Sequence, residues 1–280
     1  MRNVLLISSI VVLLLGSVSH GQESAPPTAA FSLAWLKSVV SIEIHDAQTG
    51  KDSSIGTGFL VETPNKHFAL ITAKHVVYEN EGKGRLLQDI AYRINTKDGK
   101  SHVVPDQVAA ARVNSSWFRS GPYDLACRLI VVQNVSDFAA ISYSQFLQKG
   151  RIEYGDPLFI IGFPLGLRSD QYAKPIVRRA SVARIEEGLF IVDGFVYPGN
   201  SGGPVVYAPA FRWTPFLVGE WFVGMVLAYI PYVEPAISSQ TKRPRIVFEE
   251  NSGLAIVLPA DSILELLRSP EFVKADEAIR

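Results

Sequence analysis

The sequence has few of the residues that cross-link chains, bind metals or attract nucleic acid. Its 280 residues contain one cysteine, Cys127, which excludes an intramolecular disulfide and any site built from several cysteines. Lysine plus arginine number 27, as do aspartate plus glutamate, so the basic excess of a nucleic-acid-binding protein is absent. The His-Glu-x-x-His and phosphate-loop motifs are also missing. We therefore expect no cofactor, no metal and no nucleic-acid partner, and a fold held together by core packing.

The first residues have the pattern of an export signal. Arg2 precedes an apolar run over residues 4–15, and small residues follow as far as Gly21, where we expect cleavage. The run is about half as long as the ~20 residues that a membrane-spanning helix needs, so an uncleaved anchor is the weaker alternative. The sequence thus predicts a signal peptide at 1–21, a leader at 22–35 and a secreted or periplasmic protein without a stable membrane anchor.

The remaining chain has the pattern of a β protein. Short runs rich in valine, isoleucine and aromatic residues alternate with glycine, proline and asparagine, as in strands separated by turns. Residues 58–72 are predicted to form a hairpin around the turn at 63–65. Two later runs, at 222–229 and 254–258, are predicted to be strands of the second half.

A polar stretch at about residues 134–155 divides two strand-rich halves of similar size, at about 36–133 and 154–258. One helix is predicted at 261–268, where leucines and isoleucine give an apolar face and Pro270 follows the last turn. Residues 269–280 are predicted to be a tail. The sequence therefore predicts one two-part domain over 36–268.

The most specific local pattern is a serine flanked by glycines, Gly-Asn-Ser-Gly-Gly at 199–203. Glycines let the backbone turn sharply, expose the Ser201 hydroxyl and leave amide N–H groups free to face a developing oxyanion. A plain turn can have this sequence, and so can the Gly-x-Ser-x-Gly elbow of α/β-hydrolases. That elbow needs a histidine after the serine, whereas the last histidine is His102. The order that remains is histidine, aspartate, serine.

His75 and Asp124 are the candidates for the base and the acid. His75 follows an apolar run, at a strand end from which a side chain can face a cleft, whereas the other histidines lie in the signal region or in polar surroundings. Asp124 precedes the apolar run at 125–132, and its carboxylate could orient an imidazole. Taken alone, each residue could equally be structural.

Taken together, these segments resemble the trypsin-like serine proteases, and among them the HtrA (Deg) type. The resemblance covers about residues 36–268 and implies two perpendicular six-stranded antiparallel β-barrels and a C-terminal helix, with the active site in the cleft between the barrels. It rests on four motifs: Gly-Thr-Gly-Phe at 56–59, Thr-Ala-Lys-His at 72–75, Asp-Leu-Ala at 124–126 and Gly-Asn-Ser-Gly-Gly-Pro at 199–204.

The resemblance implies a serine endopeptidase that cleaves protein or peptide substrates through an acyl-enzyme. Ser201 would attack the peptide carbonyl, His75 would be the general base, and Asp124 would orient His75. The N–H groups of Gly199 and Ser201 would form the oxyanion hole. A catalytically inactive pseudoprotease that binds proteins and an esterase on the same fold are the alternatives, and the oligomeric state is not indicated.

The resemblance also places the primary specificity pocket between the strand before the serine and the strand at 223–225. The backbone of Val223, Gly224 and Met225 would then pair with the substrate, and Phe195 would form a buried apolar floor where trypsin has an aspartate. Because such a floor offers a lysine or arginine no counter-charge, we expect cleavage after small or medium apolar residues. Asn200 replaces an aspartate that pairs with a newly cut N-terminus in some members, so activity should not depend on a defined N-terminal residue.

Overall fold

The computed structural model describes residues 31–46, 48–111, 113, 116–169, 171–207 and 219–279. The predicted signal peptide and the leader up to residue 30 lie outside the described residues. From Phe31 onward the chain forms one compact unit. Among the described residues, no helix combines the length and the apolar character needed to cross a membrane.

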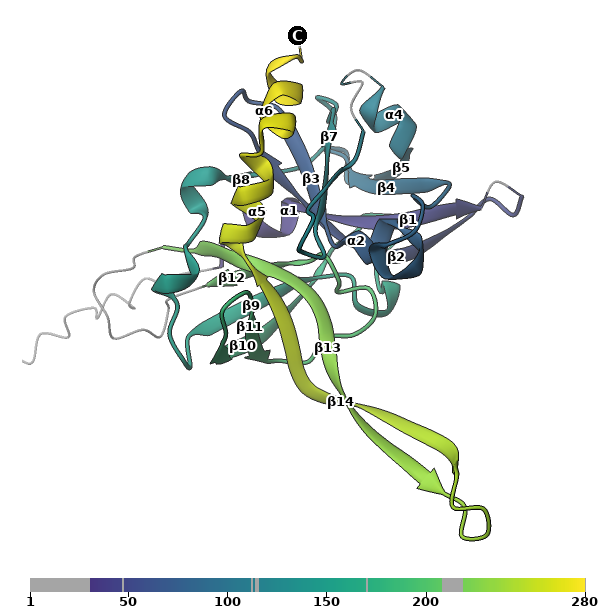
Figure 1. Ribbon diagram of the computed structural model, residues 1–280. Coiled ribbons are helices and arrows are strands. Elements are labelled where there is room, and N and C mark those ends of the chain that lie inside the picture. Colours follow the sequence, from purple (N-terminus) through teal and green to yellow (C-terminus); the bar gives the residue numbers. More distant parts are fainter. Residues whose placement is uncertain are drawn as a thin grey trace, which may run out of the picture. The chain divides into compact units, whose positions relative to one another are not determined.

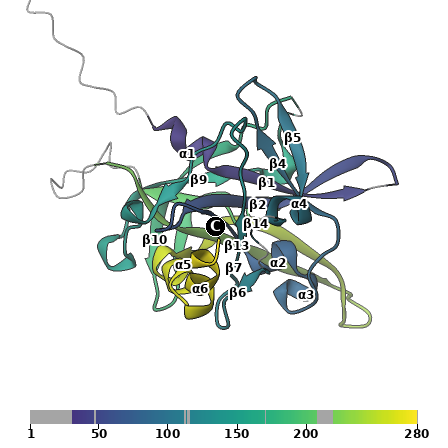
Figure 2. The same cartoon turned by 90° about the horizontal axis from the view of Figure 1, so that it is seen from above.

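The first half of the protein is a sheet of eight strands (Figures 1 and 2). Its hydrogen-bonded path is β5-β4-β1-β2-β3-β7-β6, with antiparallel neighbours, and β8 pairs in parallel with β2. Within the described residues the path does not join β5 to β6, so closure into the expected six-stranded barrel is not confirmed, and the β4–β5 hairpin extends the sheet beyond β1. The strands are β1 (Val39–Asp46), β2 (Lys51–Glu62), β3 (Phe68–Thr72), β4 (Ile90–Asn95), β5 (Ser101–Pro105), β6 (Phe118–Arg119), β7 (Ala126–Ile130) and β8 (Ile141–Ser142).

The second half is a barrel of six antiparallel strands in the order β10-β11-β14-β13-β12-β9, closed by pairing between β9 and β10. Alternate apolar side chains such as Ile160, Val205 and Val257 are fully buried inside it. The predicted all-β class with two antiparallel sheets is therefore confirmed. The strands are β9 (Pro157–Gly162), β10 (Ile176–Ile185), β11 (Phe190–Asp193), β12 (Pro204–Tyr207), β13 (Trp221–Ile237) and β14 (Pro244–Pro259).

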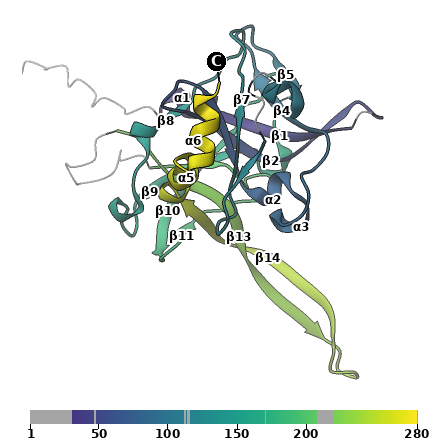
Figure 3. The same ribbon diagram turned by 45° about the horizontal axis from the view of Figure 1, so that its top comes forward.

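Strands β13 and β14 continue past the barrel as a two-stranded arm (Figure 1) that points away from the C-terminal helices (Figure 3). The sequence predicted only the barrel part of these strands, because Pro231 and Pro235 in β13 and Pro244 in β14 interrupt the strand pattern. A two-stranded ribbon tolerates them, since each strand has a free edge at which a missing N–H breaks no ladder hydrogen bond.

Short helices connect and cover the sheets. The predicted helix is confirmed as α5, and its partner α6 occupies most of the predicted tail, where Phe272 is buried. At the other end, α1 buries Trp35, which we had placed in the leader. The helices are α1 (Leu33–Lys37), α2 (Lys74–Val77), α3 (Glu79–Gly82), α4 (Asp106–Ala110), α5 (Ala260–Leu267) and α6 (Pro270–Glu277), with 3₁₀ turns η1 (Tyr143–Gln145), η2 (Lys149–Arg151) and η3 (Pro164–Gly166).

The buried carboxylate of Asp276 attaches α6 to the turn between β2 and β3. It accepts hydrogen bonds from Thr63 Oγ1 at 2.9 Å and Asn65 Nδ2 at 2.8 Å, and it contacts His67 Nδ1 at 2.9 Å. Because these partners come from a segment more than 200 positions away, the hydrophobic pattern of the tail could not predict this docking.

Candidate active site

The turn that carries Ser201 is held between the two halves of the protein. Thr57 of β2 donates its N–H to the carbonyl of Ser201 at 2.9 Å, and Gly202 donates its N–H to Val226 of β13 at 2.9 Å. At Gly202 (φ +82) a Cβ would lie 2.3 Å from Thr72 Oγ1, so the end of β3 also touches the turn. The first turn of α2, which carries His75, therefore begins close to Ser201.

His75 and Asp124, which are 49 positions apart, are brought into direct contact. His75 Nδ1 lies 2.6 Å from Asp124 Oδ2, and the His75 backbone N–H donates to Asp124 Oδ1 at 3.1 Å. Burial raises the pKa of Asp124, but the hydrogen bonds and charge of His75 outweigh it, so the pKa is lowered from its ordinary value of 3.8. Asp124 is thus an anionic partner that fixes the orientation of the imidazole.

The hydroxyl of Ser201 donates a hydrogen bond to the carbonyl of Leu227 in β13 at 2.9 Å. Among the described residues, no hydrogen bond joins Ser201 to His75. A serine hydroxyl changes partner by rotation about its Cα–Cβ bond, and catalytic hydrogen bonds commonly tighten only when substrate is present. In this structure the Ser201 hydroxyl is therefore directed to β13.

Two backbone N–H groups at the turn are available to a ligand. In the described part of the chain, neither Gly199 N–H nor Ser201 N–H donates a hydrogen bond. Each of these N–H groups shares a peptide unit with the carbonyl of the preceding residue, and that carbonyl accepts a hydrogen bond. The Pro198 carbonyl accepts from Leu165 N–H at 2.6 Å, and the Asn200 carbonyl accepts from Gly203 N–H at 2.8 Å. Because a peptide unit is planar, fixing its carbonyl also fixes the direction of its N–H.

Thr57 is a functional candidate that the sequence analysis missed. Its side chain is fully buried, and Oγ1 donates to the Gly199 carbonyl at 2.6 Å while accepting from Phe163 N–H at 3.0 Å. The residue lies in the Gly-Thr-Gly-Phe motif that supports the family resemblance, but a threonine between glycines shows nothing about a partner 142 positions away. Thr57 therefore connects the first sheet to the turn that carries the two free N–H groups.

Asn200, the residue before the serine, is fully buried and holds the turn from inside. Its Oδ1 accepts a hydrogen bond from Tyr197 N–H at 3.0 Å, and the Asn200 N–H donates to the Tyr197 carbonyl at 2.9 Å. The Tyr197 ring lies under the guanidinium of Arg178, 5.1 Å from the ring centroid. In the part of the chain that the structure describes, hydrogen bonds between neighbouring residues close this turn.

The sequence hypothesis assigns substrate pairing to the backbone of residues 223–225, which lie in β13. The side chain of Val223 is fully buried inside the barrel, and that of Met225 is fully buried in the core cluster that includes first-sheet residues such as Phe59. The residue of β13 whose main-chain carbonyl contacts Ser201 is Leu227, two positions beyond Met225. A Cβ at Gly224 would lie 2.3 Å from the Leu258 carbonyl oxygen, so this residue also faces its own barrel.

Phe195 was expected to form a buried pocket floor, but it is 49% exposed. Its ring lies over Gly253, where a Cβ would be 3.4 Å from Phe195 Cζ. The expected burial of Phe195 is therefore not found.

A model of the trypsin-like peptidase domain family matches residues 56–209. Because this match covers more than half of the chain and contains His75, Asp124 and Ser201, the chain belongs to the trypsin-like peptidase domain family.

Two solved structures of the HtrA-type protease AlgW are similar to this chain. The structure with a tripeptide is 18% identical, with a TM-score of 0.49, and the match covers 84% of this chain and 60% of that one. The structure with a decapeptide is 17% identical, also with a TM-score of 0.49, and covers 85% and 65%. This chain thus spans less than two thirds of either structure. No curated protein matches the chain.

Proposed function

We propose that the protein is a secreted or periplasmic serine endopeptidase, with Ser201 as nucleophile, His75 as general base and Asp124 as the orienting acid. One observation carries this proposal, the combination of two features at one turn. The N–H groups of Gly199 and Ser201 have no acceptor among the described residues, and the turn that contains them lies beside a histidine–aspartate contact of 2.6 Å. A structural turn has no need for this combination, whereas acyl transfer requires each part of it.

Acylation follows from these positions. Ser201 Oγ turns from the Leu227 carbonyl toward His75 Nε2, transfers its proton there and bonds to the substrate carbonyl carbon. Asp124 accepts a hydrogen bond from the Nδ1–H of His75 and, as a carboxylate, stabilises the imidazolium. The substrate carbonyl oxygen, now negative, accepts hydrogen bonds from Gly199 and Ser201 N–H, each of which contributes about 10²–10³ to kcat in such sites.

Release of the products reverses the proton transfers. His75 gives its proton to the departing amine as the C–N bond breaks, which leaves Ser201 esterified by the acyl group. A water molecule then gives a proton to His75 and attacks the ester. The second tetrahedral intermediate uses the same two N–H donors, and its collapse returns the proton to Ser201 Oγ.

The residue before the cut bond is proposed to be small or medium-sized and apolar. Phe195 offers a ring surface where a cationic side chain would need a carboxylate, and its ring occupies space above Gly253. Desolvating an unpaired lysine or arginine costs several kcal/mol. The backbone of β13 from Leu227 onward, rather than residues 223–225, is proposed to pair with the substrate.

A fluorophosphonate probe tests the nucleophile. We expect it to label the mature protein on Ser201, and we expect Ser201→Ala and His75→Ala to lose labelling and to lower peptide turnover by about 10⁴-fold or more. Labelling of another residue, or equal turnover in Ser201→Ala, would refute the mechanism.

Matched substrates separate the proposal from its alternatives. An esterase would hydrolyse an ester and leave the amide with the same acyl group intact, whereas an endopeptidase cleaves both. A pseudoprotease would cleave neither and would leave Ser201 unlabelled.

A further inference from the structure

A buried ion pair connects the two halves of the protein next to the proposed site. Glu43, in β1 of the first sheet, is fully buried. Arg168, in the loop that follows β9 of the barrel, donates Nε to Glu43 Oε1 at 2.6 Å and Nη2 to Oε2 at 3.1 Å. This two-point contact fixes the orientation of the guanidinium as well as its distance from the carboxylate.

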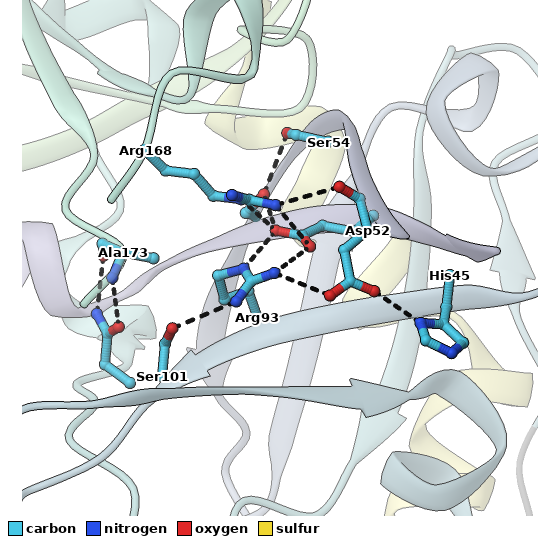
Figure 4. A network of polar contacts seen from close by, with 10 residues as sticks. His45, Asp52, Ser54, Arg93, Ser101, Arg168 and Ala173 are labelled. Atoms are coloured by element: carbon cyan, nitrogen blue, oxygen red, sulfur yellow. Dashed lines mark hydrogen bonds and ion pairs between the residues drawn. The ribbon is translucent and has the colours of Figure 1, made fainter. Parts of the chain in front are cut away.

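The pair is part of a network of matched charges (Figure 4). Arg93 of β4 donates to both oxygens of Glu43, at 2.8 and 2.9 Å, and to Asp52 Oδ2 at 3.1 Å. Asp52 also contacts His45 Nδ1 at 2.7 Å at the outer end of the network. Among the described residues, the carboxylates of Glu43 and Asp52 face the guanidiniums of Arg93 and Arg168, so the buried Glu43 is a paired anchor for Arg168.

The loop held by Arg168 contains a residue in an unfavourable backbone conformation. Leu165, within η3, has φ +56, in the left-handed region that non-glycine residues rarely adopt. Its side chain is 62% exposed, so side-chain packing contributes little to holding it there. Such a conformation persists only where surrounding contacts impose it. The tether of Arg168, three positions later, is one such contact, and the Thr57 hydrogen bond to Phe163 N–H is another.

The conformation of Leu165 bears on the oxyanion hole. Its N–H donates to the Pro198 carbonyl at 2.6 Å, and the peptide unit that contains this carbonyl also contains the Gly199 N–H. A Cβ at Gly199 would lie 2.3 Å from the Phe163 carbonyl oxygen, so the loop is in direct contact with the turn. A shift of the loop would therefore turn the Gly199 N–H away from the substrate oxygen.

We propose that Arg168 is a positioning residue for catalysis: through its ion pair with Glu43 it holds loop 163–168 so that Leu165 aims the Gly199 N–H into the oxyanion hole. This inference rests on the proposed function and extends it to two residues that do not touch substrate. It also assigns a role to the contact between the halves, since the anchor belongs to one half and the oxyanion hole to the other.

The test replaces Arg168 in the full chain and follows acylation. For Arg168→Met we expect kcat and the rate of fluorophosphonate labelling to fall by about 10- to 100-fold, because misalignment costs less than the 10²–10³ of a lost donor. KM should change less than about threefold, since the donor acts in the transition state. Arg168→Lys, which keeps the charge but lacks the two-point geometry, should give intermediate rates.

A double variant separates positioning from charge balance. Glu43→Gln combined with Arg168→Met again leaves one carboxylate and one guanidinium, so it should regain stability while kcat stays low. Arg128→Met is the matched control, because Arg128 pairs with Asp106 at 2.7 Å and is about as buried as Arg168, yet lies in β7 of the first sheet. It should lose stability and keep kcat.

Three outcomes would overturn the inference: wild-type kcat in Arg168→Met, recovery of kcat in the double variant, or an equal loss of kcat in Arg128→Met. Failure of the wild-type protein to react with the probe would instead refute the proposed function.

Discussion

Replacing Thr57 by valine tests how the first sheet controls the turn at Ser201. Valine has nearly the shape of threonine but lacks the hydroxyl, so the change removes two hydrogen bonds and little volume. The Gly199 carbonyl would lose a donor at 2.6 Å, and Phe163 N–H would lose an acceptor at 3.0 Å. Thr57 is fully buried, so water does not readily replace either partner.

The size of the effect follows from these two groups. A buried polar group left without a partner costs about 1–3 kcal/mol, so the variant would lose about 2–6 kcal/mol if the turn stayed in place. Movement of the turn relieves part of this cost at the expense of the direction of the Gly199 N–H. We expect kcat to fall by about 10- to 100-fold, less than for a lost donor, because Leu165 still holds the Pro198 carbonyl.

The assay measures kcat and KM on one peptide substrate, alongside urea unfolding of the same preparations. Thr57→Ser is the control, because it keeps the hydroxyl and loses only a methyl group, with an expected cost of about 1 kcal/mol. If Thr57→Val is destabilised but retains the kcat of Thr57→Ser, the hydroxyl does not control the turn and the reasoning is refuted.

Three further predictions concern the site and its support. Gly202→Ala should abolish probe labelling even in folded protein, because its Cβ would lie 2.1 Å from the Thr57 carbonyl oxygen; circular dichroism with in-gel labelling checks this, and normal labelling would contradict it. The lowered pKa of Asp124 contributes stability that is present above its ordinary value of 3.8 and is lost as pH falls through the lower folded-state pKa, so the advantage of wild type over Asp124→Asn in unfolding temperature should persist at pH 5 and shrink only below about 3.8. An advantage already gone near neutral pH would show another origin. Asp276→Asn should cost about 1–3 kcal/mol and speed amide exchange in α6 while leaving kcat unchanged, since its partners all lie in the β2–β3 turn.

The sequence by itself determined the class of fold and the proposed triad, because the signals for both are local. Strands were predicted from runs of apolar residues between turn residues, and α5 from its apolar face and the proline that follows. His75, Asp124 and Ser201 each lie in a short motif that can be recognised from the few residues on either side. Because a local motif does not identify a distant partner, the contact between His75 and Asp124 was expected from the family resemblance and not from their spacing.

Only the tertiary structure decided which residues support the site. Glu43 and Arg168 are 125 positions apart and Thr57 and Gly199 are 142 apart, and no local pattern relates such pairs. Register shifts in β13, including one between Val226 and Ala228, likewise decide which residue of that strand reaches Ser201. The Leu227 main-chain carbonyl accepts a hydrogen bond from Ser201 Oγ at 2.9 Å, whereas the side chains of Val223 and Met225 are fully buried. Local sequence carries the identity of a side chain, whereas its partner is set by pairing across the whole chain.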